Sequence, residues 1–434
     1  MKRRFCLALA ICVIFTGVFV GCDSVDDPLS GGTSVSDDQP NVTSTDAPSS
    51  NSSVSETTTS QTSSVTAATD APSTTSQTQK PTTSSPATIP SGKPTTTTTT
   101  PVVLGKSENN VEFIGRFATV GGTDHKQFEW SGSTITAGFE GTEISINLKI
   151  LRNGPYGEND YFNVTVDNGQ PYVLKITKGT DKYTLASGLK NGYHTVVVTK
   201  RTEAAFGALI QFEGFDYGTG KAAPAPARME RRIEIYGDSI SAGYGNEGTG
   251  NGFRLDEENA DLTYASITAK NLNAEYTAIA LSGHGVHISL SQSTTEVVPK
   301  YFDRNLYKTS GTYRFNQPDP DVVIINLGTN DYAAGVSDAD YYESYTNFVA
   351  KIRRKYPDAY IVLTTCGGTV RPMDLLQQIV DTRRTKYGDE KIGRFVGDFK
   401  DLDGAFGADG HPSVYGHKQL ADQLTDYLKE KLGW

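Results

Sequence analysis

The sequence predicts two folded domains in series, an all-β sandwich followed by an α/β domain built on a parallel sheet. Residues 102–220 consist of short runs rich in β-branched and aromatic residues, separated by Gly, Asn and Asp. Residues 229–434 instead alternate apolar runs of strand length with amphipathic runs of helical period. A length of 434 residues exceeds what one ordinary core organises, which agrees with two domains and further segments.

Residues 1–22 are typical of a bacterial lipoprotein signal peptide. Basic residues at positions 2–4 precede the apolar run 5–20, and Cys22 follows after one glycine. This end resembles the lipobox motif, although Phe19 stands where that motif usually has Leu. The resemblance implies acylation of Cys22 and an extracellular location at the bacterial cell surface. An uncleaved membrane anchor and a conventional signal peptide are the alternatives, and both also place the protein outside the cytoplasm.

Residues 23–101 are expected to form a disordered linker. Their composition is dominated by Ser, Thr and Pro and ends in PTTTTTTP (94–101). Such a stretch buries too little apolar surface to offset the entropy lost on ordering. We therefore expect a semi-extended tether whose length suits a catalytic unit held away from the cell surface.

Charge and cysteine content restrict the partners and cofactors. A formal charge of −10 and a pI near 5.2 oppose binding to a nucleic-acid backbone. Cys366 is the only cysteine outside the signal region, so no intramolecular disulfide is expected, and its apolar run predicts a buried small hydrophobe. No Cys and His cluster has zinc spacing, so we expect no metal site. Membrane contact is expected only through the lipid anchor, and nothing in the sequence indicates an oligomeric state.

The runs of residues 102–220 predict an antiparallel sandwich, because they are regularly spaced and lack a helical period. Asp167-Asn168-Gly169 predicts a turn, since this sequence tolerates positive φ. KAAPAPAR (221–228) is expected to be a short stiff connector. Examples of the alternating runs that predict strands are QFEWSG (127–132), TEISINLKI (142–150), YFNVTVDNG (161–169), YVLKITKG (172–179) and YHTVVVTKRTE (193–203).

The second domain is predicted to hold a parallel sheet covered by helices on both faces, because several of its strands are almost wholly apolar. The predicted strands are RRIEIYGDS (231–239), AEYTAIALSG (274–283), DVVIINLGTND (321–331), AYIVLTTCGG (359–368) and GRFVGDF (393–399). The predicted helices cover 264–273, 338–357, 373–388 and 413–433.

Four residues are expected at the edge of the sheet beyond the strand ends, where active sites of such sheets lie. Ser239 follows the first strand among small residues that permit a turn exposing its hydroxyl. Gly283 follows the second strand and allows close approach of a main-chain N–H. Asn330 follows the third strand with an amide that can donate to an oxyanion, and His411 precedes the last helix. Each alone also fits a helix cap, an Asx-turn or a structural histidine.

Taken in this order, the four motifs resemble the SGNH hydrolase superfamily over residues 229–434. The resemblance implies a three-layer α/β fold in which Ser239 is the nucleophile and His411 the general base. It also implies an oxyanion hole made by the N–H groups of Ser239 and Gly283 and the amide of Asn330. Such a hydrolase needs no metal and no organic cofactor.

The preceding domain sharpens this resemblance. A sandwich that opens with FIGRF (113–117), carries QFEWSGSTITAGFEGT (127–142) and joins directly to an SGNH domain resembles carbohydrate esterase family 2. The resemblance implies a jelly-roll topology and a serine esterase that deacetylates xylan and related glycans, with 6-O-deacetylation of glucans or mannans as an option. The implied partner is an acetylated plant cell-wall polysaccharide.

One position departs from the superfamily pattern. The usual Asp stands three residues before the His, but this sequence has Ala408 there and Asp409 two residues before His411. A general base needs an acceptor at its second ring nitrogen. Either the Asp409 carboxylate or a nearby main-chain carbonyl is expected to serve. More distant candidates are Asp398, Asp401 and Asp403.

Other residues near the expected cleft allow two interpretations. Tyr244, His284, His287 and Tyr332 can stack on a sugar ring or simply pack in loops, whereas Trp130 is expected in a core. Two rival functions are a lipid or thioester hydrolase on the same fold and a non-catalytic glycan-binding surface lipoprotein. The polar stretch SGHGVHISLSQS (282–293) gives little indication of a long acyl channel, and the complete Ser, Gly, Asn and His set disfavours a binding module.

Overall fold

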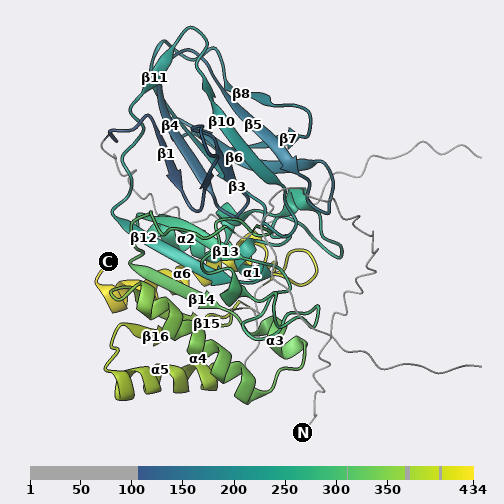
Figure 1. The fold of residues 1–434 in the computed structure, drawn as a ribbon, viewed down its shortest axis with the longest axis vertical. Coiled ribbons are helices and arrows are strands. Elements are labelled where there is room, and N and C mark those ends of the chain that lie inside the picture. The colour runs from purple at the N-terminus through teal and green to yellow at the C-terminus, as the bar shows by residue number, and fades with distance from the viewer. Residues whose placement is uncertain (1–105, 310, 367–371, 400–402) are drawn as a thin grey trace, which may run out of the picture. The chain divides into compact units, whose positions relative to one another are not determined.

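The computed structural model describes most of the region from residue 106 to the C-terminus (Figure 1). The expected signal peptide, Cys22 and the expected linker lie outside the described residues. Among the helices of the described part, none combines the length and the apolar character needed to cross a membrane. The described residues are 106–309, 311–366, 372–399 and 403–434.

The first domain is a sandwich of two antiparallel sheets around one apolar core, as expected. One sheet has the order β1-β4-β9-β6-β7, with β11 also paired to β4, and the other has the order β2-β3-β10-β5-β8. The strands are β1 (Val111–Ile114), β2 (Ala118–Thr119), β3 (Lys126–Phe128), β4 (Thr134–Gly141), β5 (Ile144–Arg152), β6 (Asn159–Val166), β7 (Tyr172–Thr177), β8 (Lys182–Ala186), β9 (Gly192–Lys200), β10 (Leu209–Asp216) and β11 (Lys221–Ala223).

Two local features of the sandwich bear on the predicted turn at residues 167–169 and the predicted connector at residues 221–228. Asp167 and Asn168 adopt φ angles of 51° and 57°, as the predicted turn requires. The strand β11, however, occupies the first part of the expected connector. The four-residue β1 covers only part of the edge of β4, and β11 pairs with its remainder at Gly138–Glu140. Pairing there satisfies main-chain groups that would otherwise stand open.

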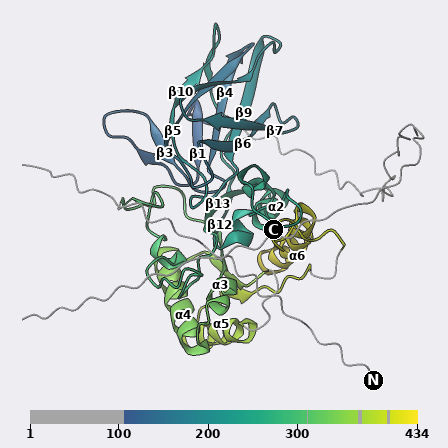
Figure 2. The same cartoon turned by 90° about the vertical axis from the view of Figure 1, so that its right-hand side faces the viewer.

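The second domain contains a five-stranded sheet with the order β13-β12-β14-β15-β16, and every pairing is parallel. Figure 2 shows α4 and α5 on one side of this sheet and α2 and α6 on the other. The strands are β12 (Arg231–Gly237), β13 (Ala274–Ala280), β14 (Val322–Asn326), β15 (Tyr360–Thr364) and β16 (Ile392–Arg394). The helices are α1 (Ser239–Ala242), α2 (Tyr264–Asn271), α3 (Thr329–Ala333), α4 (Asp338–Lys355), α5 (Met373–Tyr387) and α6 (Val414–Leu432).

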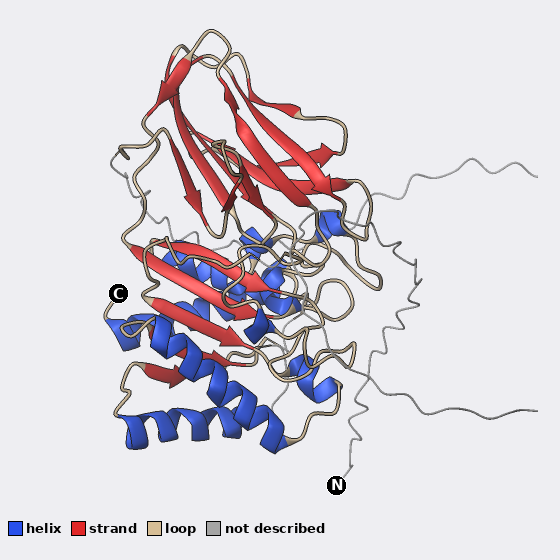
Figure 3. Cartoon of the chain, in the orientation of Figure 1, coloured by secondary structure: helices blue, strands red, loops and turns tan. Residues whose placement is uncertain are grey.

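The apolar strands of this sheet are buried on both faces, as β14 illustrates. Val323 and Ile325 pack with α4 and α5, whereas the alternate residues Val322 and Ile324 pack with α2 and α6. Side chains of a strand alternate between its faces, so a run without polar residues is required when helices cover both. This arrangement confirms the predicted α/β architecture (Figure 3).

The long helices begin at the residues that the sequence indicates. The Ser337 hydroxyl accepts a hydrogen bond from the N–H of Asp340 at the start of α4, and this helix ends just before Pro357. Ser413 caps α6 in the same way through the N–H of Gly416. Because this cap lies two residues after His411, the start of α6 also places that imidazole near the sheet.

The sandwich and the α/β domain share buried contacts. The guanidinium of Arg116, in the FIGRF motif, is fully buried and donates to the carbonyls of Tyr301 and Arg304 at 3.0 and 3.1 Å. The indole of Trp130 donates to the carbonyl of Asn305 at 2.7 Å and is 1% exposed, which confirms the expected core position. One apolar core therefore includes side chains from both sequence regions.

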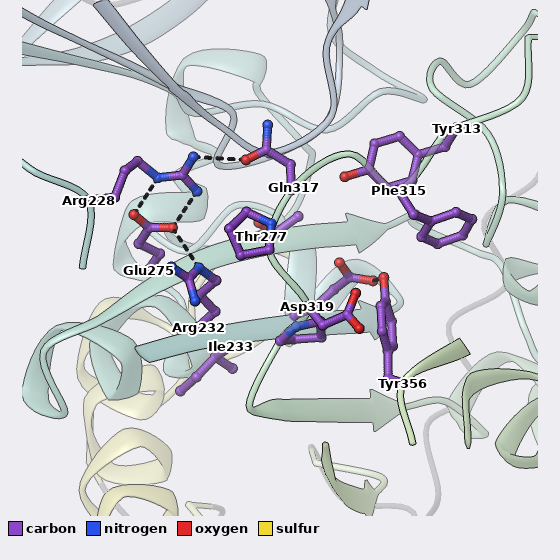
Figure 4. A pocket seen from close by; sticks show the side chains of 14 residues that line it. Arg228, Arg232, Ile233, Glu275, Thr277, Tyr313, Phe315, Gln317, Asp319 and Tyr356 are labelled. Carbon is purple, nitrogen blue, oxygen red and sulfur yellow. Dashed lines mark hydrogen bonds and ion pairs between the residues drawn. The ribbon is translucent and has the colours of Figure 1, made fainter. Parts of the chain in front are cut away.

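A second set of contacts surrounds a small polar hollow at the beginning of the sheet (Figure 4). Arg228 and Arg232 flank the carboxylate of Glu275, and Arg228 also donates to Gln317. The hollow has a volume of about 20 Å³, which is room for about one water molecule. Since Arg232 and Glu275 belong to the first residues of β12 and β13, the hollow lies at the opposite end of the sheet from Ser239.

Candidate active site

The four residues expected to act together all follow the carboxyl ends of neighbouring strands or precede a helix that starts there. Ser239 opens α1 after β12, and Gly283 lies three residues beyond β13. Asn330 lies in α3, which follows β14, and His411 lies just before α6. The strands β13, β12 and β14 are adjacent in the sheet, so these loops meet at one edge.

Ser239 and His411 are in direct contact. The Nε2 atom of His411 lies 2.8 Å from Oγ of Ser239. Ser239 is 8% exposed and begins a four-residue helix, whose preceding residue Asp238 accepts a hydrogen bond from the N–H of Ile240 at 3.1 Å. In the first turn of a helix no carbonyl one turn back is available, so the N–H of Ser239 stays open to an incoming group.

Gly283 and Asn330 are joined through the loop that follows β13. Gly283 adopts a φ of 75°, which favours glycine, and its N–H has no acceptor among the described residues. The side-chain amide of Asn330 donates one hydrogen bond to the carbonyl of His284 at 3.0 Å. That bond uses one of the two amide protons, and the second can reach a developing oxyanion.

Asp331 holds the same loop, a role that sequence reasoning did not assign. Its buried carboxylate accepts hydrogen bonds from the N–H groups of Val286, His287 and Ile288 at 2.9, 2.7 and 3.0 Å. Burial raises the pKa of this carboxyl group, and the three hydrogen bonds oppose that shift. Asp331 directly follows Asn330 at the end of DVVIINLGTND (321–331). This position beside a candidate site residue is the sequence feature that could have indicated its role.

The carboxylate of Asp409 does not contact the second nitrogen of His411. One of its oxygens accepts from the hydroxyl of Tyr244 at 2.9 Å and the other from the N–H of Gly252 at 2.8 Å. The Nδ1 atom of His411 is buried and has no partner with hydrogen-bond geometry among the described residues. Asp409 adopts a φ of 51°, and this left-handed turn directs its side chain to Tyr244.

The surroundings of His411 favour the neutral imidazole. Burial lowers its pKa, whereas the main-chain carbonyls of Ala408 and Asp409 and the charge of Asp409 oppose this shift. The ring of Tyr244 lies against the imidazole with centroids 4.2 Å apart and an interplanar angle of 30°. A neutral imidazole bonded to a serine hydroxyl can accept its proton, which is the first requirement for nucleophilic catalysis.

Two of the remaining acidic candidates, Asp398 and Asp403, belong to the described residues. Asp398 is joined to Gln423 of α6 through its main-chain N–H and carbonyl, and Asp403 is exposed. Asp401 lies outside the described residues. Of the two described candidates, neither Asp398 nor Asp403 is among the groups that shift the pKa of His411.

The sandwich contributes an aromatic cluster beside the imidazole. Tyr156 and Phe206 of the sandwich pack with Phe253, with ring centroids 4.7 and 5.0 Å from it. Phe253 in turn lies 4.4 Å from the ring of Tyr244, which covers His411. Tyr156 is 45% exposed, so this cluster runs from the imidazole to solvent. Sequence reasoning named only Tyr244 of these four aromatic residues.

Several other expected residues are engaged by the protein itself. His284 donates from Nδ1 to the carbonyl of Ser282 at 2.9 Å, and Nδ1 of His287 lies 2.8 Å from the hydroxyl of Ser344. The hydroxyl of Tyr332 donates to Asp338 at 2.8 Å. Cys366 is buried, as expected, and burial raises the pKa of its thiol to about 12. In the described ranges no group of three or more His, Cys, Asp or Glu side chains is placed to hold a metal ion.

Two family models match the chain. One, described as carbohydrate esterase 2 N-terminal, matches residues 113–226, and the other, described as the GDSL-like lipase/acylhydrolase family, matches residues 235–419. The second segment includes all four residues of the candidate site.

Known proteins resemble the chain over the same region. The cellulase/esterase CelE of Acetivibrio thermocellus is 38% identical over 320 residues, which cover 70% of this chain and 38% of CelE. The chain thus spans well under half of that relative. An acetylxylan esterase / glucomannan deacetylase of Cellvibrio japonicus is 25% identical over 76% of this chain and 91% of that protein.

A solved structure extends the likeness to three dimensions. A family two carbohydrate esterase from Clostridium thermocellum in complex with cellohexaose has a TM-score of 0.68 and 35% identity to this chain. The match covers 75% of this chain and 99% of the solved one, so it includes both the sandwich and the α/β domain.

Proposed function

Because the chain belongs to carbohydrate esterase family 2, we propose that it is a serine esterase that removes acetyl groups from plant cell-wall polysaccharides. The contact of 2.8 Å between Nε2 of His411 and Oγ of Ser239 carries this proposal, because it joins a nucleophile to a base. The proposed localisation is the extracellular face of a bacterial cell, with a lipid anchor at Cys22.

The proposed reaction is acyl transfer to water in two steps. Oγ of Ser239 attacks the ester carbonyl carbon while Nε2 of His411 takes the hydroxyl proton. The oxyanion accepts hydrogen bonds from the N–H groups of Ser239 and Gly283 and from the amide of Asn330. His411 then gives this proton to the departing sugar oxygen, which leaves as a hydroxyl group. Water then attacks the acetyl-serine, again through His411, and acetate leaves.

The second nitrogen of His411 is proposed to face a main-chain carbonyl, which makes the catalytic pair a Ser–His dyad. The carbonyls of Ala408 and Asp409 both raise the pKa of the imidazole, as acceptors near Nδ1 would. The carboxylate of Asp409 is occupied by Tyr244 and Gly252. Its charge still stabilises the imidazolium that forms when Ser239 is deprotonated, without a direct hydrogen bond.

The proposed substrate class follows from the relatives. CelE is named a cellulase/esterase, the Cellvibrio protein is named for acetylxylan and glucomannan, and the Clostridium esterase was solved with cellohexaose. These names share β-linked cell-wall glycans. We therefore propose acetylated xylan and glucomannan as substrates, including 6-O-acetyl groups of glucomannan.

Acetate release from acetylated xylan, glucomannan and pectin tests the proposal, with Ser239→Ala as the matched variant. We expect release from xylan or glucomannan and its near-complete loss in Ser239→Ala, because only the hydroxyl is removed. Substantial acetate release by Ser239→Ala would refute the mechanism. Hydrolysis of long-chain nitrophenyl esters in preference to acetyl esters would favour a lipase or thioesterase. Glycan binding without acetate release would favour a binding protein.

A further inference from the structure

The segment between β9 and β10 of the sandwich reaches residues 282–284 of the α/β domain. We call these residues the oxyanion loop, because they include the proposed donor Gly283. Arg201, Thr202 and Glu203 follow β9 directly, and all three are at most 1% exposed. The main-chain carbonyl of Arg201 accepts a hydrogen bond from the N–H of Ala260 at 2.8 Å, which joins this segment to the α/β domain. A charged residue in such a buried position needs partners close by.

Glu203 finds these partners in Ser282. One carboxylate oxygen accepts from the N–H of Ser282 at 2.7 Å, and the other accepts from its hydroxyl. The carbonyl of Ser282 accepts from Nδ1 of His284 at 2.9 Å. All three polar groups of Ser282 are therefore engaged, two of them by a side chain from the other domain.

Ser282 directly precedes Gly283, whose N–H is one proposed oxyanion donor. The same short loop ends at His284, whose carbonyl accepts from the amide of Asn330, another proposed donor. Glu203 thus holds one end of the loop and Asn330 the other. A displacement of Ser282 would move the N–H of Gly283 and the anchor of the Asn330 amide together.

The need to hold the two domains together does not by itself explain why a glutamate is buried at position 203. Arg201 already crosses the boundary, donating from Nε to the carbonyl of Glu258 at 3.2 Å and from Nη2 to the carbonyl of Asp256 at 3.0 Å. The main-chain N–H of Glu203 also donates to the buried carboxylate of Glu258 at 3.3 Å, and the charge of Glu203 acts on that second carboxyl group. Burial raises the pKa of both groups, and the charge of Lys200 opposes the shift. Burying two interacting carboxyl groups destabilises the domain boundary. A neutral side chain would hold the two domains together at a lower cost in free energy.

We propose that Glu203 is a positioning residue for acyl transfer, by which the sandwich domain holds the oxyanion loop through Ser282. This inference rests on the proposed function of Ser239, Gly283 and Asn330. It makes the sandwich part of the catalytic unit, because the α/β domain by itself lacks a group in this place.

The test compares four variants of the full chain: Glu203→Ala, Glu203→Gln, Ser282→Ala and the control Glu140→Gln. Glu140 is an exposed glutamate of β4 whose salt-bridge partner is Lys221 at 3.0 Å. We expect Glu203→Ala to lower kcat by about 10- to 100-fold with KM changed less than about threefold, since misplaced donors weaken only the transition state. Glu203→Gln keeps an acceptor for the N–H of Ser282, so its loss should stay within about fivefold.

Ser282→Ala removes only the hydroxyl contact, and we expect a kcat loss of about 3- to 10-fold. The double variant Glu203→Ala/Ser282→Ala should lose no more kcat than Glu203→Ala alone, because Glu203→Ala already removes the hydroxyl contact that Ser282→Ala removes. Glu140→Gln should match the unaltered protein. The fraction of folded protein is measured for each variant by thermal melting, so that kcat refers to folded molecules.

A second readout separates this inference from the proposed substrate. A fluorophosphonate labels an activated serine and uses the oxyanion donors, but needs no glycan. Slower labelling of Ser239 in Glu203→Ala supports the inference even when no polysaccharide is hydrolysed, an outcome that would reject only the substrate. Unchanged kcat and labelling per folded molecule, or a loss confined to KM, would overturn it. If Glu203→Ala does not fold, Ser282→Ala decides by the same criteria.

Discussion

At the scale of single residues, the chemistry depends on how His411 is oriented and charged. Its Nε2 side is occupied by Ser239, whereas its Nδ1 side has no side-chain acceptor among the described residues. The ring is instead confined by Tyr244, which lies against it and donates to Asp409. In the proposed mechanism, packing against Tyr244 and a main-chain carbonyl orient the imidazole in place of the carboxylate that the superfamily pattern predicts.

Asp409→Asn tests this arrangement. Asparagine keeps an acceptor for Tyr244 or Gly252 and leaves the main-chain carbonyl in place, but it removes the charge. We expect kcat on an acetyl ester to fall within about tenfold, which corresponds to about 1.4 kcal/mol in the barrier. A fall of about 10⁴-fold, as is typical when an orienting carboxylate is lost, would show that the carboxylate acts on the imidazole after all.

The pH dependence of kcat/KM follows from the pKa of His411. In the proposed mechanism the neutral imidazole is the active base, so we expect activity above this pKa and its loss as the pH falls through it. Burial lowers the pKa from its ordinary value of 6.5, so the acidic limb should lie below pH 6.5. The charge of Asp409 raises this pKa, and its removal in Asp409→Asn should move the limb to still lower pH. An acidic limb above pH 6.5 in the unaltered protein would contradict the assignment.

At the scale of elements, the site is built from loops at the ends of β12, β13 and β14, and the loop after β13 is held most firmly. Asp331 binds three successive N–H groups of this loop, and a Cβ atom on Gly285 would lie 2.5 Å from Cγ of Asp331. The loop and the start of α3 therefore form one rigid unit, so the proposed oxyanion donors Gly283 and Asn330 are positioned together.

Asp331→Asn tests this rigidity. The amide NH₂ of asparagine cannot accept, so at least one of the three N–H groups loses its partner in a buried place. We expect a stability loss of about 1–3 kcal/mol, the usual cost of an unsatisfied buried group. We also expect a lower kcat per folded molecule. Chemical denaturation measures the first and acetyl-ester kinetics the second. Unchanged values of both would show that the loop holds itself.

At the scale of the whole molecule, the described region works as one unit while its tether remains a proposal. The sandwich supplies Arg116 to the buried boundary and Glu203 to the oxyanion loop, and its aromatic residues line the space beside His411. The match to the Clostridium esterase likewise includes both sequence regions. The acidic chain has no positive surplus for an anionic partner, which agrees with a neutral glycan substrate.

Cys22→Ala tests the proposed anchor. The change removes the only sulfur that the lipobox-like motif offers for acylation, so a fatty-acid probe should no longer label the protein in bacterial cells. The protein should also leave the membrane fraction, with unchanged esterase activity in solution, since Cys22 lies far outside the catalytic region in sequence. Labelling that persists in Cys22→Ala would reject a lipoprotein.

The sequence by itself determined the kind and order of the elements. The alternation in YVLKITKG and the apolar run of β14 are local signals, because periodicity depends on residues a few positions apart. Short edge strands such as β11 are not predicted from the sequence, because three residues are too few to show a periodic pattern. Whether such residues form a strand depends on an unpaired edge of the sheet elsewhere in the fold. The order of the motifs also predicts that Ser239, Gly283, Asn330 and His411 lie together, because parallel strands end at one edge of the sheet.

Only the tertiary structure decided which side chains meet across long separations. Glu203 and Ser282 are 79 residues apart, and Tyr244 and Asp409 are 165 apart. In the sequence, Glu203 follows a strand among charged residues and would ordinarily be solvated. Likewise, Asp409 stands closest to His411 along the chain, yet its left-handed backbone turns the carboxylate to Tyr244. Such contacts follow from loop conformation and domain packing, which bring together residues that share no local pattern.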